Sequence, residues 1–470
     1  MNNQEKTTLR KLLPLIAVIA IPVALQNLLT TTGSMIDTMM LSSLGEKTVG
    51  AVGLCAQFTS LMFSGYWGFV GGGMLFFAQY WGAGDGEGIR RSYGMTFCFM
   101  MISGLVFGYL AVFQPEAVMN LYTSSEPIQE IGVRYLRVVG WSFPLNVTAM
   151  AMSCLLRSIE QVKIPLYGGI AAVVTNCVCN YILIFGKFGF PKLGVIGAAV
   201  GTIMASVVNI TIIVTCVLVK RIPYLLEFWG HFKWTKDSVK EYLQKCFPII
   251  ANEVMIGIGN MLINIVLGHQ IDEAIAATAV FRIFEGFIIA FFSGFSNAAS
   301  VLVGKEVGAG NHEVAFDRAV RIIYLCSAVS GAACFTILAL HTPLLHALGL
   351  SGESFRLATG MLAIFCFVCI IRMGNWAHND TFRSAGDPSF GSTLEIIFMF
   401  AMVQPVIHLA NGPLHLPFLA VFALCYCDEP IRYIMMQFHL YSRKWIRPVS
   451  DTGKATIGAF REKYGVKIAG

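Results

Sequence analysis

Residues 79–85 read QYWGAGD, and residues 305–311 read KEVGAGN. The Gly-Ala-Gly turn of the first stretch therefore recurs in the second, displaced by 226 positions (308 − 82). The same offset aligns Pro22 with Pro248, Gly33 with Gly259, Phe58 with Phe284, Gly68-Phe69 with Gly294-Phe295, Arg157-Ser158 with Arg383-Ser384, Gly186 with Gly412, and Pro191 with Pro417. A general excess of apolar residues would not align prolines, arginines and a glycine turn at one offset, so the chain is a duplication.

The composition places this duplication in a membrane. Of the 470 residues, 56% are hydrophobic and only 13% charged, and the mean hydropathy is +0.67. Soluble proteins average about 25% charged residues. So few polar residues cannot cover a water-soluble fold, which excludes soluble enzymes and nucleic-acid-binding modules.

Twelve apolar stretches are long enough to cross about 30 Å of hydrocarbon. They cover roughly 12–42, 49–80, 92–113, 133–156, 164–186, 194–219, 247–270, 275–303, 318–340, 355–381, 390–411 and 416–441. We therefore predict an N-lobe over 1–221, a cytoplasmic linker over 222–246, a C-lobe over 247–441 and a cytoplasmic tail over 442–470. Six spans return the chain to its starting side, so the predicted fold is an all-α polytopic membrane protein with two six-helix lobes related by a pseudo-twofold axis along the membrane normal.

Lysines and arginines orient the chain. With the N-terminus inside, 24 of the 33 basic residues fall on inner segments. Only six fall outside, namely Lys47, Arg134, Arg137, Lys187, Lys192 and Arg356. The positive-inside rule therefore predicts a multi-pass protein of the cell (plasma or inner) membrane with both termini in the cytoplasm.

The cysteine spacing and the lack of a phosphate-binding motif argue against disulfides, a zinc site and ATP hydrolysis. The 13 cysteines follow no disulfide or zinc spacing, and Cys177, Cys179, Cys425 and Cys427 lie in apolar runs. The G-x-x-x-x-G-K-[ST] phosphate loop is absent from the sequence, so nothing indicates ATP hydrolysis. We expect a secondary transporter in which the two halves rock to give alternating access, with neither enzymatic activity nor a cofactor.

A series of short motifs carries a family resemblance. In chain order they are Pro22, Met35–Met40, Gln79–Asp85, Leu156-Arg157, Lys163–Pro165, Asn176–Asn180, Gly186–Pro191, Gly194–Thr202, Val303–Gly310 and Phe382–Asp387. Together with the twelve spans and the duplication, this order resembles the multidrug and toxic compound extrusion (MATE) family over about residues 10–445. The resemblance implies cation-coupled export of amphipathic, often cationic organic compounds through a V-shaped pair of lobes.

Asp37 is the candidate coupling residue of the N-lobe. It is flanked by apolar residues in the first span, where its charged form is disfavoured, so it is able to trade a proton for a cation. The resemblance implies an ion-coupling site that adds Asn176, Asn180 and Thr202. Many relatives carry Asp where Asn180 stands, and one negative charge fewer favours H⁺ over Na⁺, although the oxygens at Asp37, Asn176 and Asn180 still suit Na⁺. The alternative role for Asp37 is a helix-packing acid paired with a neighbouring amide.

The C-lobe candidates are Glu253, Arg282 and Glu285. Glu253 lies five residues after Pro248, at the repeat position of Asn27, and serves either in transport or in a structural hydrogen bond. Arg282 and Glu285 share a helix face at i, i+3, either as a neutralised pair or as a substrate or gate contact. Pro22 is the expected hinge of the first span.

Other intramembrane charges have packing interpretations. A pair between Glu395 and Arg372 is conceivable, although the sequence does not support it. Asp428, Glu429 and Arg432 are spaced to satisfy one another at i, i+3 or i, i+4.

The sequence as a whole favours an H⁺- or Na⁺-coupled antiporter for small organic cations. Its expected partners are these substrates and membrane lipids but no nucleic acid, and we expect a monomer. A lipid-linked precursor flippase of the same superfamily is one alternative, and a non-transporting membrane receptor is another.

Overall fold

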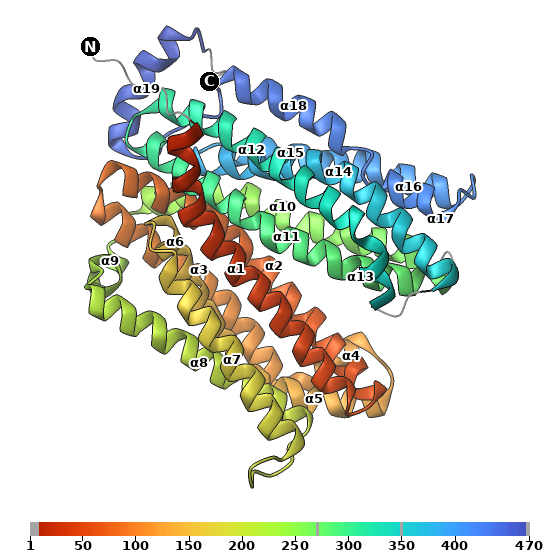
Figure 1. The fold of residues 1–470 in the computed structure, drawn as a ribbon. Coiled ribbons are helices and arrows are strands. Elements are labelled where there is room, and N and C mark those ends of the chain that lie inside the picture. The colour runs from red at the N-terminus through yellow and green to blue at the C-terminus, as the bar shows by residue number, and fades with distance from the viewer. Residues whose placement is uncertain (1–8, 269–271, 348–350, 467–470) are drawn as a thin grey trace. The chain divides into compact units, whose positions relative to one another are not determined.

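The structure, a computed structural model, describes residues 9–268, 272–347 and 351–466. Across these ranges it is built of helices without a strand, which confirms the predicted all-α class (Figure 1). The first half contains α1 (Leu9–Ser42), α2 (Glu46–Ala83), α3 (Gly86–Phe113), α4 (Pro115–Tyr122), α5 (Glu126–Val139), α6 (Ser142–Ser158), α7 (Lys163–Phe185), α8 (Val195–Lys220), α9 (Pro223–Leu226) and the 3₁₀ helix η1 (Phe228–Phe232). The second half contains α10 (Lys236–Gly268), α11 (Asp272–Gly308), α12 (His312–Ala339), α13 (His341–Ala347), α14 (Gly352–Ser384), α15 (Pro388–Phe398), the π turn η2 (Met399–Val403), α16 (Gln404–Asn411), α17 (Phe418–Leu424), α18 (Glu429–Ser442) and α19 (Asp451–Lys463).

The predicted twelve spans correspond to these helices, although two spans are broken. Ten helical segments in the described ranges are individually long and apolar enough to cross a membrane, and the α5–α6 pair, bent by 50°, makes an eleventh. The twelfth predicted stretch, 416–441, is covered by the shorter helices α17 and α18, separated by the turn at 425–428. Pro430 explains this break, because proline lacks the N–H that would continue the helical ladder across the turn.

The duplication extends to features that hydropathy did not predict. The short helices α4 and α13 begin at Pro115 and His341, again 226 residues apart (341 − 115). Each follows the third span of its half. The repeated unit therefore includes a connecting helix as well as six spans.

The Gly-Ala-Gly turns end α2 and α11 in the same way. Gly84 has φ +70° and Gly310 has φ +81°, a left-handed conformation that glycine adopts without a side-chain clash. Asp85 N–H donates to Tyr80 O, and the N–H of Asn311 donates to Glu306 O, both at 2.9 Å. These 6→1 bonds are those of a helix ending on a left-handed glycine, which explains the recurrence of the turn.

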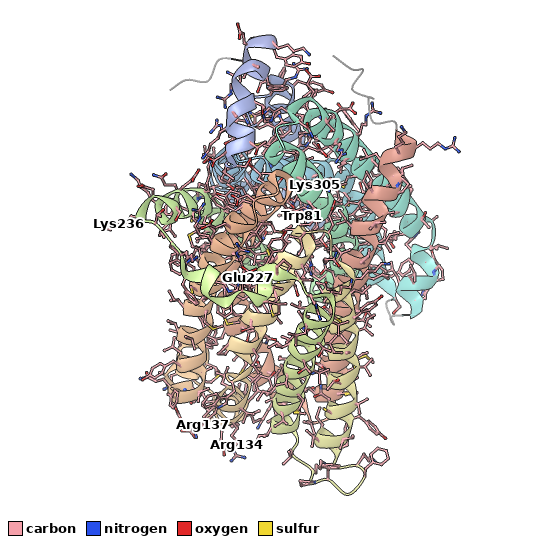
Figure 2. All side chains as sticks on the ribbon, turned by 90° about the vertical axis from the view of Figure 1, so that its left-hand side faces the viewer. Trp81, Arg134, Arg137, Glu227, Lys236 and Lys305 are labelled. Carbon is pink, nitrogen blue, oxygen red and sulfur yellow. The ribbon has the colours of Figure 1, made fainter. Side chains whose placement is uncertain are left out.

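The helices are grouped into two compact units. The N-terminal unit comprises residues 25–77 and 86–243, and the C-terminal unit comprises 1–24, 78–85 and 244–470. The continuous helices α1 and α2 each contribute to both units. Within the N-terminal unit, Arg134 and Arg137 lie at one end, and Glu227 and Lys236 lie toward the other (Figure 2).

The segments predicted as linker and tail are largely folded. From Lys236 onward the linker forms the start of α10, and before that Glu227 pairs with Arg90 of α3 at 2.8 Å. In the tail, Trp445 and Ile446 are fully buried, and α19 buries Ile457 and Phe460. Both segments are polar by composition, but buried apolar side chains order them.

Candidate functional site

Asp37 lies near the end of α1, about one and a half turns before Ser42. Its Oδ1 accepts a hydrogen bond of 2.7 Å from Asn180 Nδ2 on α7. Asn180 is 1% exposed, whereas Asp37 is half-buried. The structure therefore brings together a carboxylate and an amide that are 143 residues apart in the chain.

Asn176 completes this cluster from the same face of α7, one turn before Asn180. With its amide nitrogen turned toward the carboxylate, that nitrogen lies 3.1 Å from Asp37 Oδ2. In the opposite orientation its oxygen accepts from Asn180 Nδ2 at 3.2 Å. Asn176 can thus present either a donor or an acceptor to its neighbours.

Thr202 is not hydrogen-bonded to the other three predicted residues. Its hydroxyl donates to Ala198 O, one turn earlier on α8, at 3.1 Å. The contact with the cluster comes from the preceding residue, because a Cβ on Gly201 would overlap Asn180 Oδ1. Glycine at 201 therefore lets α8 approach the amide closely, and the buried Asn180 Oδ1 has no hydrogen-bond partner.

The bonds at Asp37 are made by neutral groups. In the part of the chain that the structure describes, no lysine or arginine forms an ion pair with this carboxylate. The same ranges contain no group of three or more His, Cys, Asp or Glu side chains arranged to hold a metal ion. Asp37 therefore has amide partners but no permanent positive partner.

Glu253, on α10, lies in a different environment. Its Oε1 is 3.3 Å from Arg383 Nη1 on α14, and the same nitrogen lies 3.7 Å from Asp380 Oδ1. Ser296 Oγ donates to the other oxygen of Asp380. Glu253 is thus joined to Arg383 and not, among the described residues, to the predicted companions on α11.

The predicted pair on α11 forms separately. Arg282 Nη1 lies 2.5 Å from Glu285 Oε2, and Arg282 Nη2 donates to Asn264 Oδ1 at 2.6 Å. The Glu285 side chain is 6% exposed and that of Arg282 is 43% exposed, so the carboxylate is buried and the guanidinium is not. The ion pair expected from the spacing is present, whereas its role in transport stays a prediction.

Sequence reasoning missed a buried network centred on Glu395 of α15. Glu395 Oε2 accepts from Asn252 and Asn379, each at 3.1 Å. Its Oε1 lies 3.5 Å from Arg432 Nη1 on α18. The conceivable pair with Arg372 does not form; Arg372 Nε instead lies 3.9 Å from Glu429.

Arg432 holds the predicted local set on α18 as well. Its guanidinium lies 3.2 Å from Asp428 and 3.4 Å from Glu429, which confirms the i, i+4 and i, i+3 pairing. Asn375 Nδ2 donates to Glu429 Oε2 at 2.7 Å. The spacing revealed the local pairs, but the contact with Glu395 depends on how α15 packs against α18.

Comparison with known proteins agrees with this arrangement. The family model MatE matches residues 22–182 and again 248–408. The chain belongs to the MatE family of multidrug efflux transporters. The two MatE matches begin and end 226 residues apart (248 − 22 and 408 − 182), so they repeat the offset found in the sequence.

Individual MATE relatives are distant. The chain is 23% identical over 416 residues to the uncharacterized transporter YisQ of Bacillus subtilis, covering 87% of this chain and 90% of the relative. It is 22% identical over 395 residues to the probable multidrug resistance protein YoeA of the same organism, covering 82% and 84%. A crystal structure of MATE in complex with MaL6 matches with a TM-score of 0.82 at 18% identity, over 92% of this chain and 96% of that one, which shows the shared fold.

Proposed function

We propose that this MATE-family chain is an antiporter that exports amphipathic organic cations against an inward flow of H⁺ or Na⁺. The observation that carries the proposal is the Asp37 carboxylate, bonded to Asn180 and Asn176 without an ion-pair partner in the described chain. A carboxylate in an apolar span is costly when charged and uncompensated. Binding of a proton or a small cation would remove that cost, and release would restore it.

The charges of the C-terminal unit favour cationic substrates. The networks around Arg383 and Arg432 contain five carboxylates, those of Glu253, Asp380, Glu395, Asp428 and Glu429. Three arginines, Arg372, Arg383 and Arg432, pair with them. An excess of acid over base supports a cation transporter rather than a flippase for anionic lipid-linked precursors.

The direct test is ethidium efflux from proteoliposomes with a pH gradient or a Na⁺ gradient imposed separately. Efflux driven by either gradient would support the antiporter. Absence of efflux under both gradients, with the protein correctly inserted, would contradict it. Uptake of a lipid-linked precursor under the same conditions would favour the flippase.

Asn180→Asp is expected to strengthen the response to Na⁺. The substitution adds a second carboxylate beside Asp37, and Na⁺ prefers carboxylate and carbonyl oxygens. Native efflux should follow the pH gradient, and the variant should respond more to a Na⁺ gradient. Native efflux driven fully by Na⁺ and indifferent to pH would refute this assignment of the amide.

The proposed topology places both termini in the cytoplasm of a monomeric membrane protein. Glu126 and Lys236 are exposed residues of the N-terminal unit that the charge distribution assigns to opposite sides. In whole cells, a cysteine replacing Glu126 should react with an impermeant maleimide, and one replacing Lys236 should not. The unsubstituted chain sets the background from its 13 cysteines, and the reverse labelling pattern would overturn the orientation.

Pro22 is the proposed hinge of α1. It lies inside this continuous helix, where proline removes one hydrogen bond of the ladder. Two residues further on, after Ala24, the helix passes from the C-terminal to the N-terminal unit. A weak point in α1 next to this boundary suits a helix that bends during transport.

A further inference from the structure

The chain does not leave the C-terminal unit after α18. Residues 445–450, here called the strap, run from Trp445 to Ser450 and lead into α19. Trp445 and Ile446 are fully buried, and Val449 and Ser450 are 3% and 1% exposed. Five of the six residues of this segment are thus buried, and only Arg447 exposes its side chain.

The strap bonds the ends of two long helices. Val449 N–H donates to Gln79 Oε1 in the last turns of α2 at 2.7 Å. Ser450 Oγ donates to the carbonyl oxygen of Gly308, the last residue of α11, at 2.7 Å. Gln79 is fully buried, and its Nε2 donates to Ser384 O at 2.8 Å, so both ends of its amide are used.

These two helix ends cross with their backbones in contact. A Cβ on Gly82 would overlap Lys305 O, and one on Gly308 would overlap Gln79 O. The two contacts are equivalent under the duplication, because 305 − 79 and 308 − 82 both equal 226. Trp81 and Lys305 accordingly lie next to each other in Figure 2.

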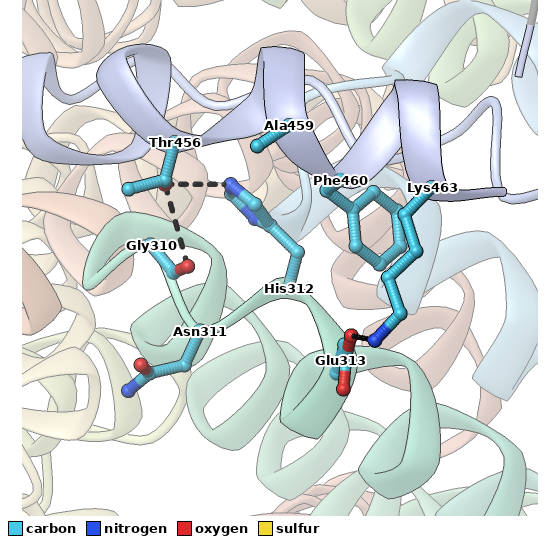
Figure 3. Close-up of a pocket in the computed structure, with 8 residues that line it drawn as sticks. All are labelled: Gly310, Asn311, His312, Glu313, Thr456, Ala459, Phe460 and Lys463. Carbon is cyan, nitrogen blue, oxygen red and sulfur yellow. Dashed lines mark hydrogen bonds and ion pairs between the residues drawn. The ribbon is translucent and has the colours of Figure 1, made fainter. Parts of the chain in front are cut away.

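Further contacts fasten the strap on both sides. Arg447 N–H donates to Ala385 O at 2.9 Å, and Arg447 Nη1 lies 3.3 Å from Asp387, both in the turn between α14 and α15. On the other side, α19 covers the start of α12, with a groove of about 210 Å³ between them (Figure 3). Thr456 and His312 are hydrogen-bonded at 3.0 Å, and Lys463 pairs with Glu313 at 2.5 Å.

We propose that the strap is a latch that holds the ends of α2 and α11 crossed, and that it releases Gln79 and the Gly308 carbonyl when the protein opens at this end. The inference rests on the proposed transport, since alternating access requires helices from the two sequence halves to separate at one face and then at the other. The crossing involves equivalent residues from the two sequence halves, whereas the strap comes after the second half of the sequence. In this view Gln79 and Ser450 are positioning residues that set how readily this face opens.

Hydrogen exchange of the purified full-length protein in nanodiscs tests the latch without substrate. Gln79→Met removes the bond from Val449 N–H, together with the bond from Gln79 Nε2 to Ser384 O. Ser450→Ala removes the bond to Gly308 O, together with the capping bond that Ser450 Oγ accepts from Gly453 N–H. Amides at 80–86 and 305–311 should then exchange roughly fivefold faster, the factor that corresponds to loss of about 1 kcal/mol in one hydrogen bond. Lys444→Ala, a change to an exposed side chain just before the strap, should exchange like the native protein.

The segments in which hydrogen exchange becomes faster decide whether the latch proposal holds. Faster exchange at both helix ends in both variants supports the latch. Faster exchange confined to residues 445–452, with the helix ends unchanged, would show that the strap only anchors the tail and would overturn the proposal. This readout needs no gradient, so it is independent of the proposed function.

Efflux measured on the same variants separates the two proposals. If the native chain transports ethidium, the latch predicts an altered efflux rate for Gln79→Met and Ser450→Ala at normal protein level, and an unaltered rate for Lys444→Ala. Native efflux that both strap variants leave unchanged would contradict the latch while the antiporter stands. No native efflux together with faster exchange at the helix ends would contradict the antiporter and leave the structural latch supported.

Discussion

Asp37→Asn is expected to reach the membrane at normal levels and to lose gradient-driven efflux. The amide has the shape of the carboxylate and keeps an oxygen that can accept from Asn180 Nδ2. Asn176 can turn its own oxygen toward the new N–H₂ group, because both of its orientations find partners. The fold should therefore survive, while the group that exchanges an ion is gone.

The expected loss of efflux is roughly 5- to 150-fold, the range that typical coupling free energies of about 1–3 kcal/mol represent. Ethidium efflux from proteoliposomes with equal amounts of protein measures it. Asp37→Glu should retain part of the activity with a shifted pH optimum, because the carboxylate is kept but displaced.

Glu253→Gln is the matched control in the other half. Glu253 already has a permanent positive partner in Arg383, so its neutralisation should have a milder effect on coupling. Near-normal efflux by Asp37→Asn under an imposed pH gradient would show that the ion pathway lies elsewhere.

Arg432→Met is expected to produce the largest loss of stability. The Arg432 side chain is 6% exposed, and its guanidinium lies within 3.5 Å of Glu395, Asp428 and Glu429. Removing it leaves the buried carboxylates of Asp428 and Glu429 and the largely buried one of Glu395 without this positive partner. Breaking a buried ion pair typically costs about 3–5 kcal/mol. The expected result is a large drop in thermal midpoint in detergent and a lower level of folded protein in the membrane.

Arg134→Met provides the comparison at an exposed pair. Arg134 and Glu130 are 62% and 67% exposed, and such surface ion pairs contribute about 0–1 kcal/mol. Its thermal midpoint should remain close to that of the native protein. An equal drop in thermal midpoint for Arg432→Met and Arg134→Met would show that burial of the Arg432 network does not determine how much it contributes to stability.

The environment of Asp37 was partly predictable. The residue stands out as an acid in an apolar stretch, and the four-residue spacing of Asn176 and Asn180 places both amides on one face of a helix. Thr202, which only the family resemblance added to the site, is not hydrogen-bonded to this cluster, because its hydroxyl bonds within α8 and the contact comes from the neighbouring Gly201. Side-chain direction at a helix contact depends on packing that spacing alone does not reveal.

The sequence by itself determined the helical membrane class, the duplication at an offset of 226 and the turns that end α2 and α11. These properties depend on apolar length, on repetition along the chain and on local backbone conformation, all of which a linear sequence carries. Only the tertiary structure decided that Glu395 pairs with Arg432 rather than Arg372, and that a polar tail contains a buried strap bonded to Gln79. Each of these contacts joins residues that are far apart in the chain and that meet only because the helices pack in one particular way. In addition, the partner of a backbone N–H such as that of Val449 cannot be predicted from composition or periodicity, because every non-proline residue carries the same group.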